Sequence, residues 1–548
     1  MHAKLERLTA KQPASGSELS YAERRQRLLT FGIVLLGMLV AALNQTVVST
    51  AMPRIAADLN AFNDYSWVFT SFMVTSSASL PIFGKLSDMY GRKQFFIGGI
   101  AVLVVSSALA GLSRNITELV IYRGIQGVGA GMLLAMSIAT VGDLFSPLER
   151  GKYQAFNQGV WSFASFVGPL VGGVITDHLD WRWVFYANIP IGLVAMAVAF
   201  VFMPPLKHQT GWGKVDYLGA GVLLLAVTPL LVALSSAGVR YAWTSTQVLG
   251  LFAFSAAMLV VFWFVESRAQ EPIMPPRLFT SSIFLVTGIA GFMTGLAFFA
   301  AAIYLPLLVQ AVMGHSATAS GLLLMPLMLA SLAGSIISGQ LISRWGRYRM
   351  IALCTMAVGT LGMVLLSRTG PQTASAMVML DMVLLGLSWG SAIPIFMVAV
   401  QNAFPQHMAG MVLSSSAFLR SLGAAVGAAI MGTIVASRFS SSFQASLPAA
   451  AREALEGAGG TMPSNPQALL NPVAMSSLQN QLQGVDAGTF QQIVETMRSS
   501  LAGSLGPAFL VGALAAGLGF VVCFSLKEIP LRASNSSSVH HETTEPDA

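Results

Sequence analysis

The sequence predicts an all-α membrane protein of fourteen transmembrane helices, built from two six-helix repeats with two inserted helices between them. Composition is the first reason: 54% of the 548 residues are hydrophobic and 10% are charged, which is too little charge to cover a globular surface of this size. A duplicated motif is the second. The glycine-rich polar stretch at 84–93 recurs, partly changed, at 339–349, and its glycines keep an offset of 255 positions (339 − 84 and 346 − 91).

A second pair of motifs keeps the same register. Gly168 and Gly172 lie in one apolar run, and Gly423 and Gly427 lie in another, again 255 positions later (423 − 168 and 427 − 172). Two motif pairs at one offset indicate an internal duplication, whereas one short match would carry little weight. The chain is therefore expected to fold as two related halves.

Apolar runs of roughly 20 residues, the length that crosses a bilayer core, divide the chain. A basic segment at 1–27 precedes six runs at 28–203, and it has no cleavage site, so it should remain cytoplasmic. Two inserted runs occupy 204–281, six more occupy 282–526, and 527–548 is a polar cytoplasmic tail. The fourteen runs lie near 28–50, 67–83, 95–112, 118–140, 153–175, 183–203, 215–235, 247–265, 282–310, 317–342, 350–367, 375–400, 410–436 and 503–526.

The basic residues predict the orientation in the membrane. Twenty lysines and arginines fall on the side of the amino terminus, eight fall on the other side, and two lie within helices. This asymmetry favours both termini in the cytoplasm, as an even number of helices requires. We expect a plasma-membrane protein, in the inner membrane if the source is Gram-negative. The net charge of +7 comes from short clusters between apolar runs, so it does not indicate nucleic-acid binding.

One external loop, at 437–502, is long and rich in proline and glycine. Near 473–497 it has a stretch that could form an amphipathic helix. We interpret it as a solvated connector with surface helices, in preference to a ligand-binding lid, because only some long loops have a function of their own.

No residue pattern indicates an enzyme. The two cysteines, Cys354 and Cys523, both lie in apolar runs, so neither a disulfide framework nor metal-ligand spacing is present. The sequence has no phosphate-binding loop and no arrangement of nucleophile and base. We therefore expect neither a cofactor nor a metal.

The repeated polar stretch is interpreted as a gating loop, in preference to a basic loop that only sets topology. Its glycines allow a tight turn and close helix approach, while its acid and its bases can form ion pairs. Asp143, at the same end of a neighbouring helix, could complete that network, whereas Ser343 replaces Asp88 in the second copy. The predicted loop residues are Gly84, Asp88, Gly91, Arg92 and Lys93, with Gly346 and Arg347 in the second copy.

Few ionisable residues fall within the helices, and burying charge in a membrane is costly, so each is a candidate for function. They are Glu118, Arg123, Asp381 and Arg420. A separate candidate is the helix that carries Gly168, Pro169, Gly172 and Gly173. Its proline bends the helix and its glycines let a neighbour approach, which would form a leak-proof seam. The alternative is ordinary packing of small residues.

These motifs together resemble those of the major facilitator superfamily. The stretch at 84–93 looks like its loop motif, and the similarity runs from about 28 to 527. The other stretches are 123–131, which resembles its helix-four arginine motif; 159–173, which resembles its antiporter motif; and 43–53 and 181–192, which are similar to patterns of fourteen-helix drug/proton antiporters.

The resemblance implies a major facilitator fold and secondary active export of hydrophobic or amphipathic small molecules. Its halves would open alternately around a midplane cavity, with protons as the coupling ion, and the protein would act as a monomer in the lipid bilayer. The inserted helices are expected to lie outside the transport path. The candidate cavity residues are Asn44, Gln45, Gln126, Trp161, Tyr304 and Ser388.

Asn44 departs from the resemblance, because an aspartate usually stands at this place and asparagine cannot titrate. We therefore hypothesise that Asp381 carries the proton and that Arg123 modulates its protonation across the cavity. The alternative is that Asp381 reaches the outer surface. Other functions also stay open: an uncoupled facilitator, an exporter of an endogenous metabolite or lipid, or a membrane sensor or scaffold that reuses the fold.

Overall fold

The structure is a computed structural model. It describes residues 21–59, 66–204, 216–237, 241–315, 317–370, 372–405, 408–448 and 487–531, together with residues 452, 476, 479 and 480. Residues 1–20 of the predicted amino-terminal segment lie outside the described residues, and so does most of the predicted tail.

Helices make up nearly all of the described chain, and no strand occurs within it. The first half contains α2 (Tyr21–Thr46), α3 (Val48–Asp58), α4 (Ser66–Tyr90), α5 (Arg92–Gly111), α6 (Ile116–Leu144), α7 (Pro147–His178), α8 (Trp183–Tyr186) and α9 (Asn188–Phe202). The middle contains α10 (Tyr217–Ser236), α11 (Thr246–Arg268) and α12 (Arg277–Thr280). The second half contains α13 (Ser282–Leu307), the π-helical turn η2 (Leu308–Val312), α14 (Ala317–Trp345), α15 (Arg349–Leu366), α16 (Ser375–Ala403), α17 (Ala409–Ser446) and α20 (Ala487–Cys523).

The described residues form fourteen long helices when α2 with α3, α8 with α9, and α13 with η2 are each counted as one interrupted helix. Thirteen of these are long and apolar enough to cross a membrane. The fourteenth, α4, has 25 residues, but serine and threonine side chains lower its hydropathy. The polar residues of α4 face its helical neighbours, as described below, which is how a membrane protein accommodates them.

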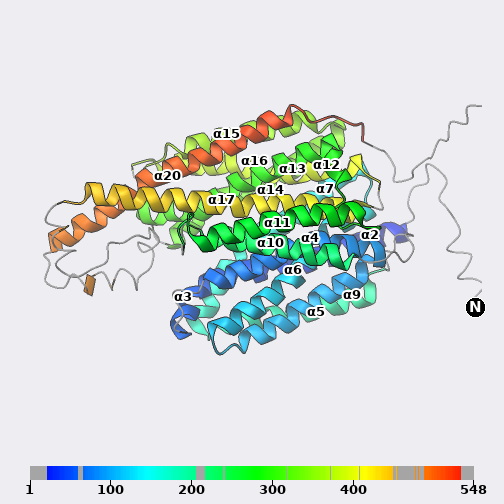
Figure 1. The fold of residues 1–548 in the computed structure, drawn as a ribbon, viewed down its shortest axis with the longest axis horizontal. Helices are drawn as coiled ribbons and strands as arrows, with labels where there is room; N and C mark the ends of the chain where they lie inside the picture. The colour runs from blue at the N-terminus through cyan, green and yellow to red at the C-terminus, as the bar shows by residue number, and fades with distance from the viewer. Residues whose placement is uncertain are drawn as a thin grey trace, which may run out of the picture.

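The two halves meet along two seams. In one seam α4 contacts α17, and in the other α7 contacts α14. Figure 1 shows the first half, in blue and cyan, beside the green-to-red second half, with the long helices roughly parallel. Each half has its own apolar core, and the core of the first half also takes in Trp389, Leu413 and Ala417 from α16 and α17.

The inserted helices cover one of these seams. The first of them, α10, contacts both α4 and α17, and α11 packs against α10 (Figure 1). At one end, the Trp243 indole N–H donates to the Thr433 hydroxyl at 2.6 Å. At the other end, the Lys85 ammonium lies 2.7 Å from the Glu271 carboxylate. The insertion therefore bridges the two halves, although none of its described residues lines the cavity presented below.

The expected external loop at 437–502 is shorter than predicted. Helix α17 continues to Ser446 and α20 begins at Ala487. Both helices extend the packing of the second half, because Phe439, Phe443, Ile493 and Met497 are buried in its core. Of the stretch near 473–497 that could form an amphipathic helix, the portion from Ala487 belongs to α20, and nearly all of the rest lies outside the described residues.

Candidate functional site

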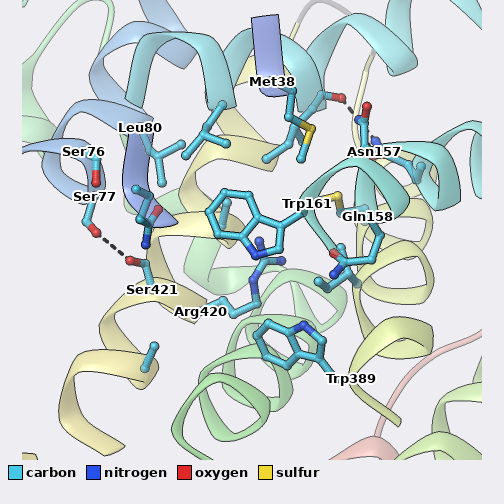
Figure 2. A pocket seen from close by; sticks show the side chains of 18 of the residues that line it. Met38, Ser76, Ser77, Leu80, Asn157, Gln158, Trp161, Trp389, Arg420 and Ser421 are labelled. Carbon is cyan, nitrogen blue, oxygen red and sulfur yellow. Dashed lines mark hydrogen bonds between the residues drawn. The ribbon is translucent and has the colours of Figure 1, made fainter. Parts of the chain in front are cut away.

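A cavity of about 140 Å³ lies between the two halves. Helices α2, α4, α6 and α7 line it from one side, and α16 and α17 line it from the other (Figure 2). Its residues are Met38, Gln45, Met73, Ser76, Ser77, Leu80, Leu134, Ile138, Gln154, Asn157, Gln158, Trp161, Trp389, Ile393, Met397, Ala417, Arg420, Ser421 and Ala424. The wall is thus mostly apolar, with amides, hydroxyls, two indoles and a single guanidinium.

Both halves touch each other beside this cavity. The hydroxyls of Ser77, on α4, and Ser421, on α17, are 2.5 Å apart, and Figure 2 shows them at the edge of the cavity. The adjacent residue, Arg420, extends into the cavity between Trp161 and Trp389. The Trp389 indole is itself held by stacking on Phe298, with ring centroids 4.0 Å apart.

Of the predicted cavity residues, Gln45 and Trp161 line the cavity. Tyr304 and Ser388 do not. Tyr304 is buried in the core of the second half. The Ser388 hydroxyl faces α15, so closely that a methyl group added to Gly359 would clash with it. Each of these two side chains is on a face of its helix that points away from the cavity.

Asn44 and Gln126 also lie away from the cavity, in a buried polar cluster of the first half with Arg123. The Gln126 amide donates to the Asn44 side-chain oxygen and to the Ser107 hydroxyl, each at 2.6 Å. Arg123 donates to the Gln126 oxygen at 2.6 Å and to the Asn44 backbone carbonyl at 3.1 Å. Its guanidinium also lies over the Phe72 ring, 4.2 Å from the centroid.

This cluster contains no carboxylate among the residues that the structure describes, and every contact of Arg123 just given is to the first half. The hypothesised partner of Arg123, Asp381, belongs to α16 in the second half. It is 1% exposed, and its Oδ1 has no hydrogen bond in the described chain. Asp381 does not line the cavity. It lies eight residues before Trp389, about 12 Å along the helix axis.

Glu118 is not a buried charge. It is partly exposed, and its carboxylate accepts from the Arg114 backbone N–H at 2.9 Å and from the Asn115 side chain at 3.0 Å. Asn115 in turn caps the first turn of α6 by accepting from the Glu118 backbone N–H. Glu118 therefore stabilises a helix start, and the signal for this was its position in the first turn.

The gating loop forms a buried ion-pair network at one end of the molecule. Arg92, wholly buried, lies 2.6 Å from the Asp88 carboxylate and 2.7 Å from the Asp143 carboxylate. The second oxygen of Asp88 accepts the backbone N–H of Met411, at the start of α17, at 2.8 Å. Gly91 has φ 99°, a conformation that favours glycine and permits the turn into α5.

Lys93 is outside this network. Its ammonium donates to the Phe200 carbonyl of α9 at 2.8 Å and lies over the Phe200 ring. The expectation that Lys93 pairs with the acid of the loop is therefore corrected: it lies in the first turn of α5, on the side that faces α9. Asp143 does join the network, as its place at the end of α6 suggested.

The second copy of the loop is held differently. Gly346 has φ 64°, so the turn is retained, but Arg347 is exposed. The neighbouring Tyr348 is buried: its backbone N–H donates to Glu528 and its hydroxyl to the Lys527 carbonyl. Burial raises the pKa of the Tyr348 phenol above its ordinary value. The segment after α20 thus occupies this corner, where the first copy has an ion-pair network.

Glycines from both copies allow the seams to close at this end. A methyl group on Gly84 would collide with Ser414 and with the Gly410 carbonyl of α17. A methyl group on Gly339 would lie 2.5 Å from the Gly151 carbonyl oxygen of α7. These are the two glycines related by the sequence offset, and each lies in one of the two seams.

The antiporter-type helix, α7, packs where the first helix is interrupted between α2 and α3. A methyl group on Gly168 would collide with Thr46, and one on Gly172 with the Val47 carbonyl. The Thr46 hydroxyl also donates to the Ala164 carbonyl at 3.0 Å. Gly173 has no heavy atom within 4 Å of an added methyl, so it gives no close approach. Pro169 lies inside α7 between the two contacts.

The second copy repeats this packing. Gly423 and Gly427 of α17 lie against the Phe292 and Leu296 carbonyls of α13, the first helix of the second half. Small residues thus bring the same pair of helices together in each half, which agrees with the internal duplication.

Known proteins resemble this chain along almost its whole length. A family model described as Major Facilitator Superfamily matches residues 34–428. The chain belongs to the major facilitator superfamily. Members are transporters that bind small molecules within the membrane, and this member is accordingly a multi-pass membrane protein with the major facilitator fold and not an enzyme.

Relatives of this major facilitator include named transporters. It is 34% identical to the multidrug transporter protein MdtP of Bacillus subtilis over 530 residues, which are 95% of this chain and 96% of MdtP. It is 31% identical to the efflux pump dotC of Dothistroma septosporum, covering 71% of this chain and 68% of that one. The crystal structure of the human organic anion transporter MFSD10 superposes with a TM-score of 0.60 at 15% identity, over 89% of this chain and 99% of the other.

Some residues of this major facilitator's cavity could not be found from sequence patterns. Ser77, Ser421, Gln158 and Trp389 belong to no motif, and serine or tryptophan in a membrane helix is common. Arg420 was found because it is charged. The others share only a geometric property, since they face the space between the halves.

Proposed function

We propose that this protein exports hydrophobic or amphipathic small molecules across the plasma membrane by alternating access, as a monomer with both termini in the cytoplasm. The observation that carries the proposal is the cavity between the halves, with the Asp88–Met411 bond and the Gly84 and Gly339 contacts closing the seams at one end. By the count of basic residues, that end is cytoplasmic. The relative dotC is an efflux pump, and this supports the direction, export.

The cavity volume is also consistent with a transport cycle in which the two halves separate and close again. A volume of about 140 Å³ is below the roughly 300–1,000 Å³ of ligand pockets. A drug-sized molecule therefore requires the halves to separate further, and the Ser77–Ser421 bond is among the contacts that would break.

We propose protons as the coupling ion and Asp381 as the coupling acid. Asp381 is buried in α16 with one carboxylate oxygen unsatisfied in the described chain, and an acid at such a place is a candidate for function. Arg123 is not retained as its modulator, because its contacts are all within the first half. The competing candidate is an uncoupled facilitator, and it is favoured by the lack of any carboxylate among the cavity-lining residues.

Purified protein in proteoliposomes with an imposed pH gradient tests this proposal. We expect wild type to accumulate an amphipathic substrate against its gradient, and Asp381→Asn to carry it only downhill. Glu495→Gln, which removes an exposed carboxylate from α20, is the matched control and should behave as wild type. Uphill transport by Asp381→Asn would exclude Asp381 as the coupling acid, and a wild type that ignores the gradient would favour the facilitator.

A further inference from the structure

The cavity has an unpaired positive charge. Arg420 is the one charged residue among those that line it, and the structure gives its guanidinium neither an ion pair nor a hydrogen bond within the described chain. Arg420 is partly buried, and withdrawing a cation from water without a partner is costly. An arginine in such a place is therefore suited to bind an anionic ligand reversibly.

The neighbouring carboxylates do not neutralise Arg420. Asp143 lies on α6, five residues beyond the cavity residue Ile138, about 7.5 Å along the helix, but it is paired with Arg92 at 2.7 Å. Asp381 lies on α16 eight residues before the cavity residue Trp389, and it does not line the cavity itself. The field inside the cavity is thus positive, and it disfavours a cationic ligand.

The surroundings of Arg420 suit an amphiphile. Its side chain lies between the Trp161 and Trp389 indoles (Figure 2), which offer flat apolar faces for an aromatic or alkyl body. Gln158 is 6% exposed and has no hydrogen bond in the described chain, so its amide is available to a polar head group beside Arg420. A planar guanidinium with this support binds carboxylates and sulfonates through two parallel hydrogen bonds.

We propose that the cavity selects anionic amphiphiles, with a monovalent anionic head group on Arg420 and an apolar body against the faces that Trp161 and Trp389 present to the cavity. This inference rests on the proposed export function, whose substrate class it names. The ligand body could come from an aromatic compound or from a lipid-like chain, since both present the same head group to the guanidinium.

The test compares three probes of one shape and different charge: 2-naphthalenesulfonate, 2-naphthalenesulfonamide and 2-naphthyltrimethylammonium. Binding is read as the rise in Tm of the purified protein with each probe, and transport is read in proteoliposomes. We expect the sulfonate to bind at least about tenfold more tightly than the ammonium, as a charge-assisted pair would give. 1-Octanesulfonate is the lipid-like probe. Comparing its affinity with that of 2-naphthalenesulfonate shows whether an alkyl chain or an aromatic ring is preferred as the apolar part of the ligand.

Variants of Arg420 locate the selectivity. Arg420→Gln should lose about tenfold in sulfonate affinity while sulfonamide binding stays unchanged, and Arg420→Lys should retain most of the preference. Arg438→Gln is the matched control, because it removes an exposed arginine from the same helix, 18 residues away. Should Arg420→Gln not fold, the three probes on wild type still decide.

The outcomes separate this inference from the function that it rests on. If wild type binds the ammonium as tightly as the sulfonate, the charge selectivity is refuted even where export is observed. If the sulfonate is bound selectively but no probe is transported, the selectivity stands and the export proposal fails. If no probe binds, the inference is overturned as well.

Discussion

The carboxylate of Asp88 accepts the backbone N–H of Met411 at 2.8 Å, across the seam between α4 and α17. The same carboxylate is held by Arg92, which also holds Asp143. One acid thus connects the ion-pair network of the first half to a helix start in the second half. This contact has to break whenever the halves separate at that end.

Asp88→Asn is expected to leave expression and membrane insertion intact and to reduce transport at least about tenfold. The amide keeps the size of the side chain, but it loses the charge that pairs with Arg92, which then has Asp143 as its remaining ion-pair partner in this network. Initial transport rates at equal expression measure the effect. Lys93→Gln is the control, because Lys93 shares the loop but not the network. Normal transport by Asp88→Asn would contradict the assigned role.

Gly339→Ala should hinder closure of the α7/α14 seam, because its methyl group would lie 2.5 Å from the Gly151 carbonyl oxygen. Backbone atoms cannot move away as a flexible side chain can, so we expect a loss of about 1–3 kcal/mol from overpacking and slower transport. Gly173→Ala, in open space on α7, should be neutral or slightly stabilising. Thermal unfolding of the two variants tests this difference, and equal Tm values would show that the seam tolerates the methyl.

Asn44→Asp should change the pH dependence of transport from that of wild type. The Asn44 amide now donates to the Val40 carbonyl at 2.9 Å while its oxygen accepts from Gln126 at 2.6 Å. A protonated aspartic acid can satisfy both partners, whereas the carboxylate places a second acceptor against the carbonyl. Transport rates from pH 5 to pH 8 in wild type and in Asn44→Asp check this expectation. Parallel profiles would mean that the polar cluster is not connected to the transport cycle.

Trp243→Phe should lower stability without changing which substrates are carried. The substitution removes the hydrogen bond between the insertion and Thr433 of α17, worth about 0.5–1.5 kcal/mol, but none of the described inserted residues lines the cavity. Trp263→Phe, half exposed on α11, is the matched control. A changed rank order of substrates in Trp243→Phe would place the insertion in the transport path.

Periodicity and duplication predicted the helical architecture because the length of each apolar run and the spacing of the repeated glycines can be read directly from the sequence. Helix α4 has too low a hydropathy to stand out as a membrane span. It carries the polar residues Ser77 and Asp88 at its contacts with the second half. The end of α17 could not be predicted, since residues such as Phe439 remain helical through packing against α20 and not through hydropathy.

The residues of the site were only partly predictable, because the sequence does not give the orientation of each helix. Charge and motif identified Arg420, Asp88 and Arg92, but they say nothing about which face of a helix points at the cavity. Ser388 and Asn44 lie on cavity helices and point elsewhere. Trp389, one residue after Ser388, lines the cavity. Helix phase relative to the opposite half depends on tertiary packing, which one sequence without its contacts does not specify.

A disulfide across the cavity edge tests alternating access between the halves most directly. The hydroxyls of Ser77 and Ser421 are 2.5 Å apart, so cysteines at these two positions would place their sulfur atoms next to each other. The measurement is transport by the double variant Ser77→Cys and Ser421→Cys, with Cys354 and Cys523 replaced by alanine, before oxidation, after oxidation and after reduction. We predict that oxidation stops transport and that reduction restores it, whereas full transport by the cross-linked protein would contradict the account.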